Sequence, residues 1–264
     1  MVSRLNLTLA ILILFVSSCA LVGCGAGGNR DNISTAVTPS RTVLDPSQTV
    51  AFTASVDGTA TQGVTWETVP TNLWTPKQGA PQPDGTIVPT GEVYISVYIN
   101  QVYVDMYVPA GTYKAPAATP YPGATRIMAR SVENSGAEGY STVYVTMTVG
   151  AGGLLDLDSD LPTAGSTGDI HWNVISGTTR QLEVANGARI VSLGAMGLAA
   201  FDELSRADLA GHTYVTTPID GSDVSNSLTP GTVVGVLTTD GKYAKIQVYG
   251  YSGNSIRLIM YTFD

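Results

Sequence analysis

Hydrophobic and polar residues alternate along most of the chain, in short runs separated by turn residues. Such alternation places every second side chain on one face, which is the pattern of a half-buried β-strand. In the first half it predicts strands at residues 33–37, 49–56, 64–68, 126–132 and 141–149. In the second half it predicts strands at residues 169–174, 180–184, 188–193, 232–238, 243–249 and 255–262. The sequence therefore predicts an all-β protein.

Only one stretch carries a helical signal. Ser205 is followed three residues later by Asp208, a spacing in which each side chain can bond to the other's backbone at the start of a helix. We expect a capped single turn there, and at most one short helix in the chain.

The most regular alternation lies at residues 93–108 (VYISVYINQVYVDMYV). If Asn100 and Gln101 form the turn of a hairpin, eight aliphatic or Met side chains share one face. The other face then carries four tyrosines, paired across the strands as Tyr94 with Tyr107 and Tyr98 with Tyr103. A slip of one residue would mix the faces, which favours this register. Asn-Gln is weaker than Asn-Gly as a two-residue turn, so a longer loop stays open as an alternative.

Two interpretations of the tyrosine face stay open. Tyrosine offers a flat ring and a hydroxyl at a small entropy cost, so the four tyrosines could form a platform for a sugar ring or a partner strand. Alternatively, tyrosine occurs there because it favours strands, and the face packs on a neighbouring domain or stays partly wet.

The N-terminal residues have the three-part layout of a secretory signal. Arg4 precedes an apolar run at residues 7–16, and small residues then lead to Cys24. This run is shorter than the ~20 residues that a membrane-spanning helix needs. We therefore expect residues 1–23 to be a signal peptide, and the small, polar residues 24–31 to be a flexible tether.

The sequence Leu21-Val22-Gly23-Cys24 resembles the lipobox of bacterial lipoproteins. This resemblance implies that Cys24 is lipidated, becomes the new N-terminus and anchors the exported chain to the cell envelope. The residue after it is Gly25 rather than Asp, which by the sorting habits of lipoproteins favours the outer membrane if the cell has one. A poorer second candidate for the lipidated residue is Cys19.

The charge and cysteine content narrow the choice of partners. The chain has 13 Lys and Arg against 21 Asp and Glu, a net charge of −8, and no run of basic residues. Nucleic acid and anionic lipid headgroups are therefore not expected as partners. Both cysteines belong to the export signal, so the folded part is built without a disulfide and depends on packed sheets for its stability.

Five blocks in the first half resemble the bacterial immunoglobulin-like repeat family. They are residues 37–39 (VTP), 48–54 (QTVAFTA), 64–66 (VTW), 111–116 (GTYKAP) and 144–149 (YVTMTV). The resemblance implies a surface β-sandwich over residues 32–150, used as a spacer or an adhesion unit and without a catalytic site of its own. Trp66 lies at the centre of a predicted strand, where a large ring commonly fills a sandwich core. The hairpin at residues 93–108 is inserted where the family has a short connection.

Residues 150–153 (GAGG) are expected to form a short hinge before a second β-rich domain at residues 154–264. At residues 231–233 (GTV), 238–246 (TTDGKYAKI) and 260–263 (MYTF), this domain is weakly similar to the β-rich module of haem-scavenging surface lipoproteins. Those carriers hold iron between two histidines. This chain has two histidines, His171 and His212, and neither aligns with a haem-ligand position. The sequence favours one strand histidine and one loop histidine.

Asp156, Asp158 and Asp160 recur at every second residue and are a weak candidate for a surface cation site. An EF-hand loop would need Gly and Glu where this chain has Leu161 and Thr167. A solvated acidic start of a strand is the simpler interpretation, so no metal or cofactor is expected.

The sequence lacks the common motifs of enzymes. It has no Gly-x-Ser-x-Gly elbow and no phosphate-binding loop, whereas paired carboxylates cannot be recognised without the fold. We therefore expect a non-catalytic surface lipoprotein that acts in binding, adhesion or spacing, with a polysaccharide or a surface protein as its partner. The alternative is a ligand carrier whose second domain binds a small molecule such as haem.

Overall fold

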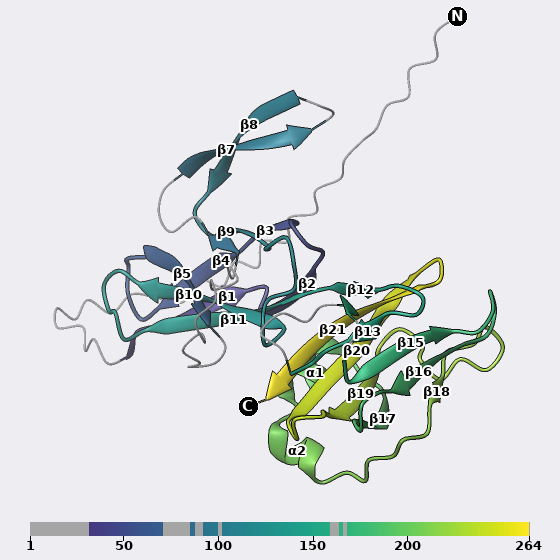
Figure 1. Ribbon diagram of the computed structural model, residues 1–264. Helices are drawn as coiled ribbons and strands as arrows, with labels where there is room; N and C mark the ends of the chain where they lie inside the picture. Colours follow the sequence, from purple (N-terminus) through teal and green to yellow (C-terminus); the bar gives the residue numbers. More distant parts are fainter. Residues whose placement is uncertain are drawn as a thin grey trace, which may run out of the picture.

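The structure is a computed structural model that describes residues 32–70, 85–87, 92–99, 102–158, 164–165 and 168–263. Strands make up 51% of it and helices 6%, which confirms the all-β prediction. The strands form two layered parts that lie side by side, with a hairpin standing away from the first part (Figure 1). No helix among the described residues is both long and apolar enough to span a membrane.

A four-stranded sheet forms the larger layer of the first part. Its order is Arg41–Leu44 (β2), Glu138–Val145 (β11), Ala124–Ser131 (β10) and Val64–Pro70 (β5). β2 runs parallel to β11, and the other neighbours are antiparallel. Two small sheets complete this part: Ser34–Thr38 (β1) with Thr53–Asp57 (β4), and Thr49–Ala51 (β3) with Thr112–Lys114 (β9) and Thr86–Ile87 (β6).

Aromatic side chains fill the core of the first part. Trp66 is buried there as predicted. The Phe52 ring centroid lies 6.4 Å from that of Trp66 and 6.5 Å from that of Tyr113. The predicted strand at residues 49–56 is broken at Phe52, whose N–H donates to the carbonyl of Gly111 at 3.0 Å. β3 and β4 consequently belong to different sheets.

The inserted hairpin has the predicted register. Glu92–Ile99 (β7) pairs with Val102–Pro109 (β8), and Ile99 lies opposite Val102. Asn100 and Gln101, the predicted turn, lie outside the described residues. Tyr98 faces Tyr103 along the ladder, and Tyr94 faces Tyr107. Among the described residues the hairpin is a two-stranded sheet of its own, and it projects away from the layers (Figure 1).

One predicted strand, residues 141–149, is divided between the two parts. It is β11 up to Val145 and then Met147–Val149 (β12), which pairs with the last strand of the chain. Thr146 lies at the break between β11 and β12, and it forms hydrogen bonds with residues of the first part. Its N–H donates to the Leu44 carbonyl at 2.8 Å, and its hydroxyl donates to Asp45 at 2.6 Å.

Two five-stranded sheets form the second part. The first is β12, Ser255–Phe263 (β21), Tyr243–Ser252 (β20), Thr232–Leu237 (β19) and Arg189–Ala195 (β17), in that order. The second is Ala164–Gly165 (β14), Leu154–Leu155 (β13), Ile170–Val174 (β15), Arg180–Val184 (β16) and Ile219–Asp220 (β18). Side chains from the facing surfaces of both sheets form the core of this part, including Trp172, Leu182, Ile246 and Leu258.

Among the described residues, two short helices occur where one capped turn was predicted. Arg206–Ala210 (α2) has the predicted capping box, in which Ser205 and Asp208 bond to each other's backbone. Leu198–Glu203 (α1) begins after Gly197 without a side-chain cap. That helix therefore lacks the signal on which the prediction depended.

The two parts share a third core cluster. It joins Ala124 and Tyr144 of the first part to Phe201 of α1 and to Val233 and Ile259 of the second part. The rings of Tyr144 and Phe201 meet edge to face, with centroids 5.3 Å apart.

Candidate functional site

A cavity of about 230 Å³ lies where the two parts meet. Residues from β10, β11, α1, β20 and β21 line it: Arg126, Thr142, Tyr144, Asp202, Lys245, Tyr261 and Phe263. None of these residues was predicted from the sequence to belong to a site, because they come from segments that are far apart along the chain.

Strand alternation explains why these side chains gather. On β11, Val143 and Val145 enter the core of the first part, so Tyr144 points the other way, into the shared cluster. On β20, Ala244 and Ile246 likewise enter the core of the second part, which leaves Lys245 on the opposite face. The cavity therefore lies between the outer faces of two sheets whose inner faces are already packed.

Lys245 forms one wall of the cavity, although only 2% of it is exposed. Its Nζ donates to the carbonyls of Phe201, Asp202 and Leu204, at 2.6, 3.0 and 2.8 Å. An ammonium group has three donors, so all of them are used at the end of α1. Burial lowers the pKa of Lys245 to about 8, and the charges of Asp202 and Asp208 oppose that shift.

Asp202 links the two parts. The Tyr144 hydroxyl donates to its Oδ1 at 2.6 Å, and the Arg41 Nε lies 3.4 Å from its Oδ2. Burial, followed by the hydrogen bond to Asp202, raises the pKa of Tyr144 well above its usual range, so its hydroxyl stays protonated. Both contacts to Asp202 come from the first part, while Asp202 lies on α1 of the second.

Arg126 lies at the exposed rim of the cavity. Its guanidinium carbon is 4.2 Å from the centroid of the Tyr140 ring, a stacking contact. Two cations, Arg126 and Lys245, and one carboxylate, Asp202, line the cavity. The lining is therefore positive, although the whole chain has a net charge of −8.

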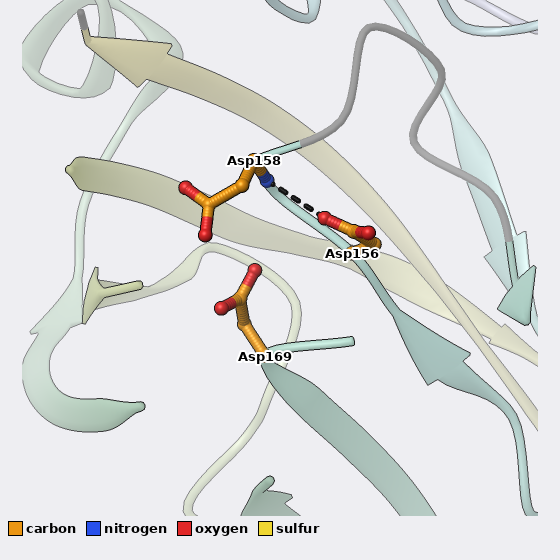
Figure 2. A group of neighbouring side chains, drawn as sticks. All are labelled: Asp156, Asp158 and Asp169. Carbon is orange, nitrogen blue, oxygen red and sulfur yellow. Dashed lines mark hydrogen bonds between the residues drawn. The ribbon is translucent and has the colours of Figure 1, made fainter. Parts of the chain in front are cut away.

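A second cavity, of about 290 Å³, is acidic. Figure 2 shows Asp156, Asp158 and Asp169 converging from two segments of the chain, and one oxygen of each lies within 4.8 Å of the others. Two of the three predicted carboxylates, Asp156 and Asp158, therefore belong to the observed cluster. Asp160 lies outside the described residues, and Asp169 is the third carboxylate.

Hydrogen bonds to the backbone account for much of this acidic cluster. Asp169 is buried and accepts from the Leu157 N–H at 2.8 Å, the Thr239 N–H at 2.7 Å and the Thr239 hydroxyl at 2.9 Å. Asp158 accepts from the Asp240 N–H at 3.1 Å. Asp156 accepts from the Asp158 N–H at 2.9 Å. Through these hydrogen bonds the cluster connects the turn after β19 to the segment after β13.

No family model and no curated protein matches this chain. Its function is therefore inferred from the residues and their geometry.

The two histidines lie on the predicted kinds of element. His171 is on β15, with its Nδ1 3.1 Å from Glu183, and His212 is exposed in the loop after α2. A hydrogen bond from Asn173 is the largest cause that lowers the pKa of Glu183, and the bond from His171 adds to it. His171 therefore lies beside a carboxylate on β16, the adjacent strand of its own sheet.

Two further predicted sites are only partly described. Cys24, the expected lipidation site, lies outside the described residues. The four tyrosines of the hairpin occupy the predicted paired positions on β7 and β8: Tyr94, Tyr98, Tyr103 and Tyr107.

Proposed function

We propose that this protein is a non-catalytic surface lipoprotein that holds a binding arm, the hairpin of β7 and β8, away from the cell envelope. The lipobox-like sequence ending at Cys24 supports the anchor. The resemblance of residues 32–150 to bacterial immunoglobulin-like repeats supports a role in adhesion or spacing. The anchor predicts that Cys24→Ser releases the chain from the membrane fraction, whereas a chain that stays there would contradict it.

The observation that carries the binding role is the isolated hairpin of β7 and β8. A two-stranded hairpin is at best marginally stable by itself in water. Among the described residues β7 and β8 pair only with each other, so their outer edges are open to a further strand. Tyrosines occupy opposed positions along its ladder, and tyrosine is a common contact residue in binding surfaces. A polysaccharide or an extended segment of a surface protein fits such an arm.

The experiment is affinity electrophoresis through gels that contain cell-wall and extracellular polysaccharides. The chain from residue 25 keeps every described residue and is compared with a Tyr98→Ser, Tyr103→Ser variant of the same fold. Tyr249→Ser is the matched control, because Tyr249 is an exposed tyrosine on β20. We expect a polysaccharide to retard the wild type and the control but not the double variant.

Two outcomes contradict this proposal. Retardation of all three proteins would place binding outside the hairpin. A wild type that no polysaccharide retards would exclude this ligand class for the arm, and a pull-down from an extract of surface proteins would then test the other partner.

A further inference from the structure

The cavity between the two parts has the size of a site for a single small ring. Its volume of about 230 Å³ is slightly below the range of about 300–1,000 Å³ that is typical of sites for drug-sized ligands. Its walls come from both parts of the chain, and junctions between packed units are preferred places for ligand sites.

Two side chains in the wall of the cavity are held in place by hydrogen bonds within the protein. Tyr144 and Lys245 are 1% and 2% exposed. The Tyr144 hydroxyl is held by Asp202, and the Lys245 ammonium is held by the end of α1. A preformed wall of this kind reduces the ordering cost of binding.

The charges favour an anionic ligand. Asp202, the one carboxylate in the lining, already has Arg41 3.4 Å away, and Lys245 adds a buried positive charge. Lys245 has no donor left for a ligand, so the direct contact falls to Arg126. Among the described residues no carboxylate forms an ion pair with Arg126. The N–H donors of a guanidinium lie in its plane, so stacking on Tyr140 leaves them available for a carboxylate.

Two aromatic rings complete the rim. Tyr261 and Phe263 lie on the same face of β21, with centroids 4.9 Å apart and planes at 65°. Both rings are partly exposed. They offer an apolar surface to a ring-shaped ligand, and Thr142 and Asp202 offer polar groups beside it.

We propose that this cavity binds a hexuronate, a sugar ring that carries a carboxylate. Arg126 takes the carboxylate in a charge-assisted pair, Tyr261 and Phe263 pack against the ring, and Thr142 and Asp202 face its hydroxyls. A neutral sugar would leave Arg126 unused, and inorganic phosphate would leave the two rings unused. This site is separate from the hairpin and does not depend on it.

The test is a titration of the chain from residue 25 with glucuronate and with glucose, followed by NMR or calorimetry. We expect glucuronate to bind with a Kd on the order of 1 mM, the weak affinity of a small ligand, and glucose at least about tenfold more weakly. Binding should weaken further at high salt. An oligomer that ends in glucuronate shows whether the terminal residue of a polysaccharide is bound as well as the free sugar.

Variants of matched type locate the site. Arg126→Gln should weaken glucuronate binding about tenfold or more. Arg189→Gln, a change at an exposed arginine on β17, should leave it unchanged. Phe263→Leu keeps an apolar side chain but removes the ring, and should weaken binding of the sugar. Near-ultraviolet circular dichroism checks the fold of each variant.

The proposal is overturned if glucuronate binds no better than glucose, or if Arg126→Gln binds as tightly as Arg189→Gln. The first comparison uses the wild type alone, so it stands even if a variant does not fold. The Tyr98→Ser, Tyr103→Ser variant should keep its glucuronate affinity, which separates this site from the proposed arm. Loss of binding in that variant would also overturn the proposal.

Discussion

Single buried polar side chains stabilise the fold by forming hydrogen bonds with backbone groups of distant segments. Lys245 satisfies three carbonyls at the end of α1, and Asp169 accepts three hydrogen bonds from Leu157 and Thr239. Carbonyls at a helix end otherwise need water or another donor. Each of these residues therefore joins segments that local sequence does not connect.

Lys245→Met should destabilise the fold by about 2 kcal/mol, because it leaves buried carbonyls without a donor. The apolar replacement also removes the cost of burying a charge, which limits the loss. Denaturation in urea measures the change, with Lys114→Met, a change at an exposed lysine, as the control. A Lys245→Met variant as stable as the control would show that water satisfies these carbonyls equally well.

The carboxyl of Asp158 should make the free energy of unfolding depend on pH. Burial is the main cause that raises its pKa above the ordinary value of an aspartate. The folded state therefore holds this proton more tightly than the unfolded state does. The cost of the ionised carboxylate is present at neutral pH and is relieved as the pH falls through the raised pKa.

Asp158→Asn should accordingly match or exceed the wild type in stability at pH 7, by up to about 1 kcal/mol. That advantage should shrink as the pH falls through the raised pKa of Asp158, because the wild-type carboxyl then takes up its proton. Urea denaturation over a series of pH values below 7 measures it. Asp169→Asn is the contrasting variant, and it should be destabilising at pH 7 because three donors face that buried carboxylate. A loss of stability in Asp158→Asn at pH 7 would contradict this account.

At the scale of elements, close approaches of strands join the two parts. β12 leaves the first part and pairs with β21, and the Thr262 N–H of β21 donates to the Pro122 carbonyl at 2.9 Å. Gly123, just before β10, has a φ of 119°. A Cβ at that position would lie 2.0 Å from the Met260 carbonyl oxygen.

Gly123→Ala should therefore destabilise the chain by at least about 3 kcal/mol, since it adds both a backbone conformation that favours glycine and a clash with a backbone atom. The matched control is Gly250→Ala, because a Cβ at Gly250 would meet nothing within 4 Å. Thermal denaturation of both variants tests this. Equal midpoints would mean that β10 and β21 do not approach so closely.

At the scale of the whole molecule, the shared core cluster makes the two parts depend on each other. Phe201 is fully buried between residues of both parts. Cooperative units in proteins follow such continuous packing, so the described layers should unfold together.

Calorimetry should therefore show a single transition whose calorimetric and van't Hoff enthalpies agree. Phe201→Ala, which empties the middle of the shared cluster, should cost about 3–5 kcal/mol. Val224→Ala should change little, because Val224 is 96% exposed. Two separate transitions in the wild type would show that the parts unfold independently.

The sequence by itself determined the features that depend on neighbouring residues. Alternation with a period of two is local, and it predicted most strands to within a few residues, together with the pairing of Tyr98 with Tyr103. The spacing of Ser205 and Asp208 predicted the capping box of α2 for the same reason. Trp66 was placed in the core because a large apolar ring in mid-strand has to be buried.

Only the tertiary structure decided which faces meet. Tyr144 bonds to Asp202 across 58 positions of the sequence, and Asp169 bonds to Thr239 across 70. No local pattern marks such pairs, since each follows from the packing of whole sheets. The break at Phe52, the division of residues 141–149 between two sheets and the positive cavity beside Lys245 arise in the same way. Alternation predicts that a strand has two faces, and long-range packing decides what each face contacts.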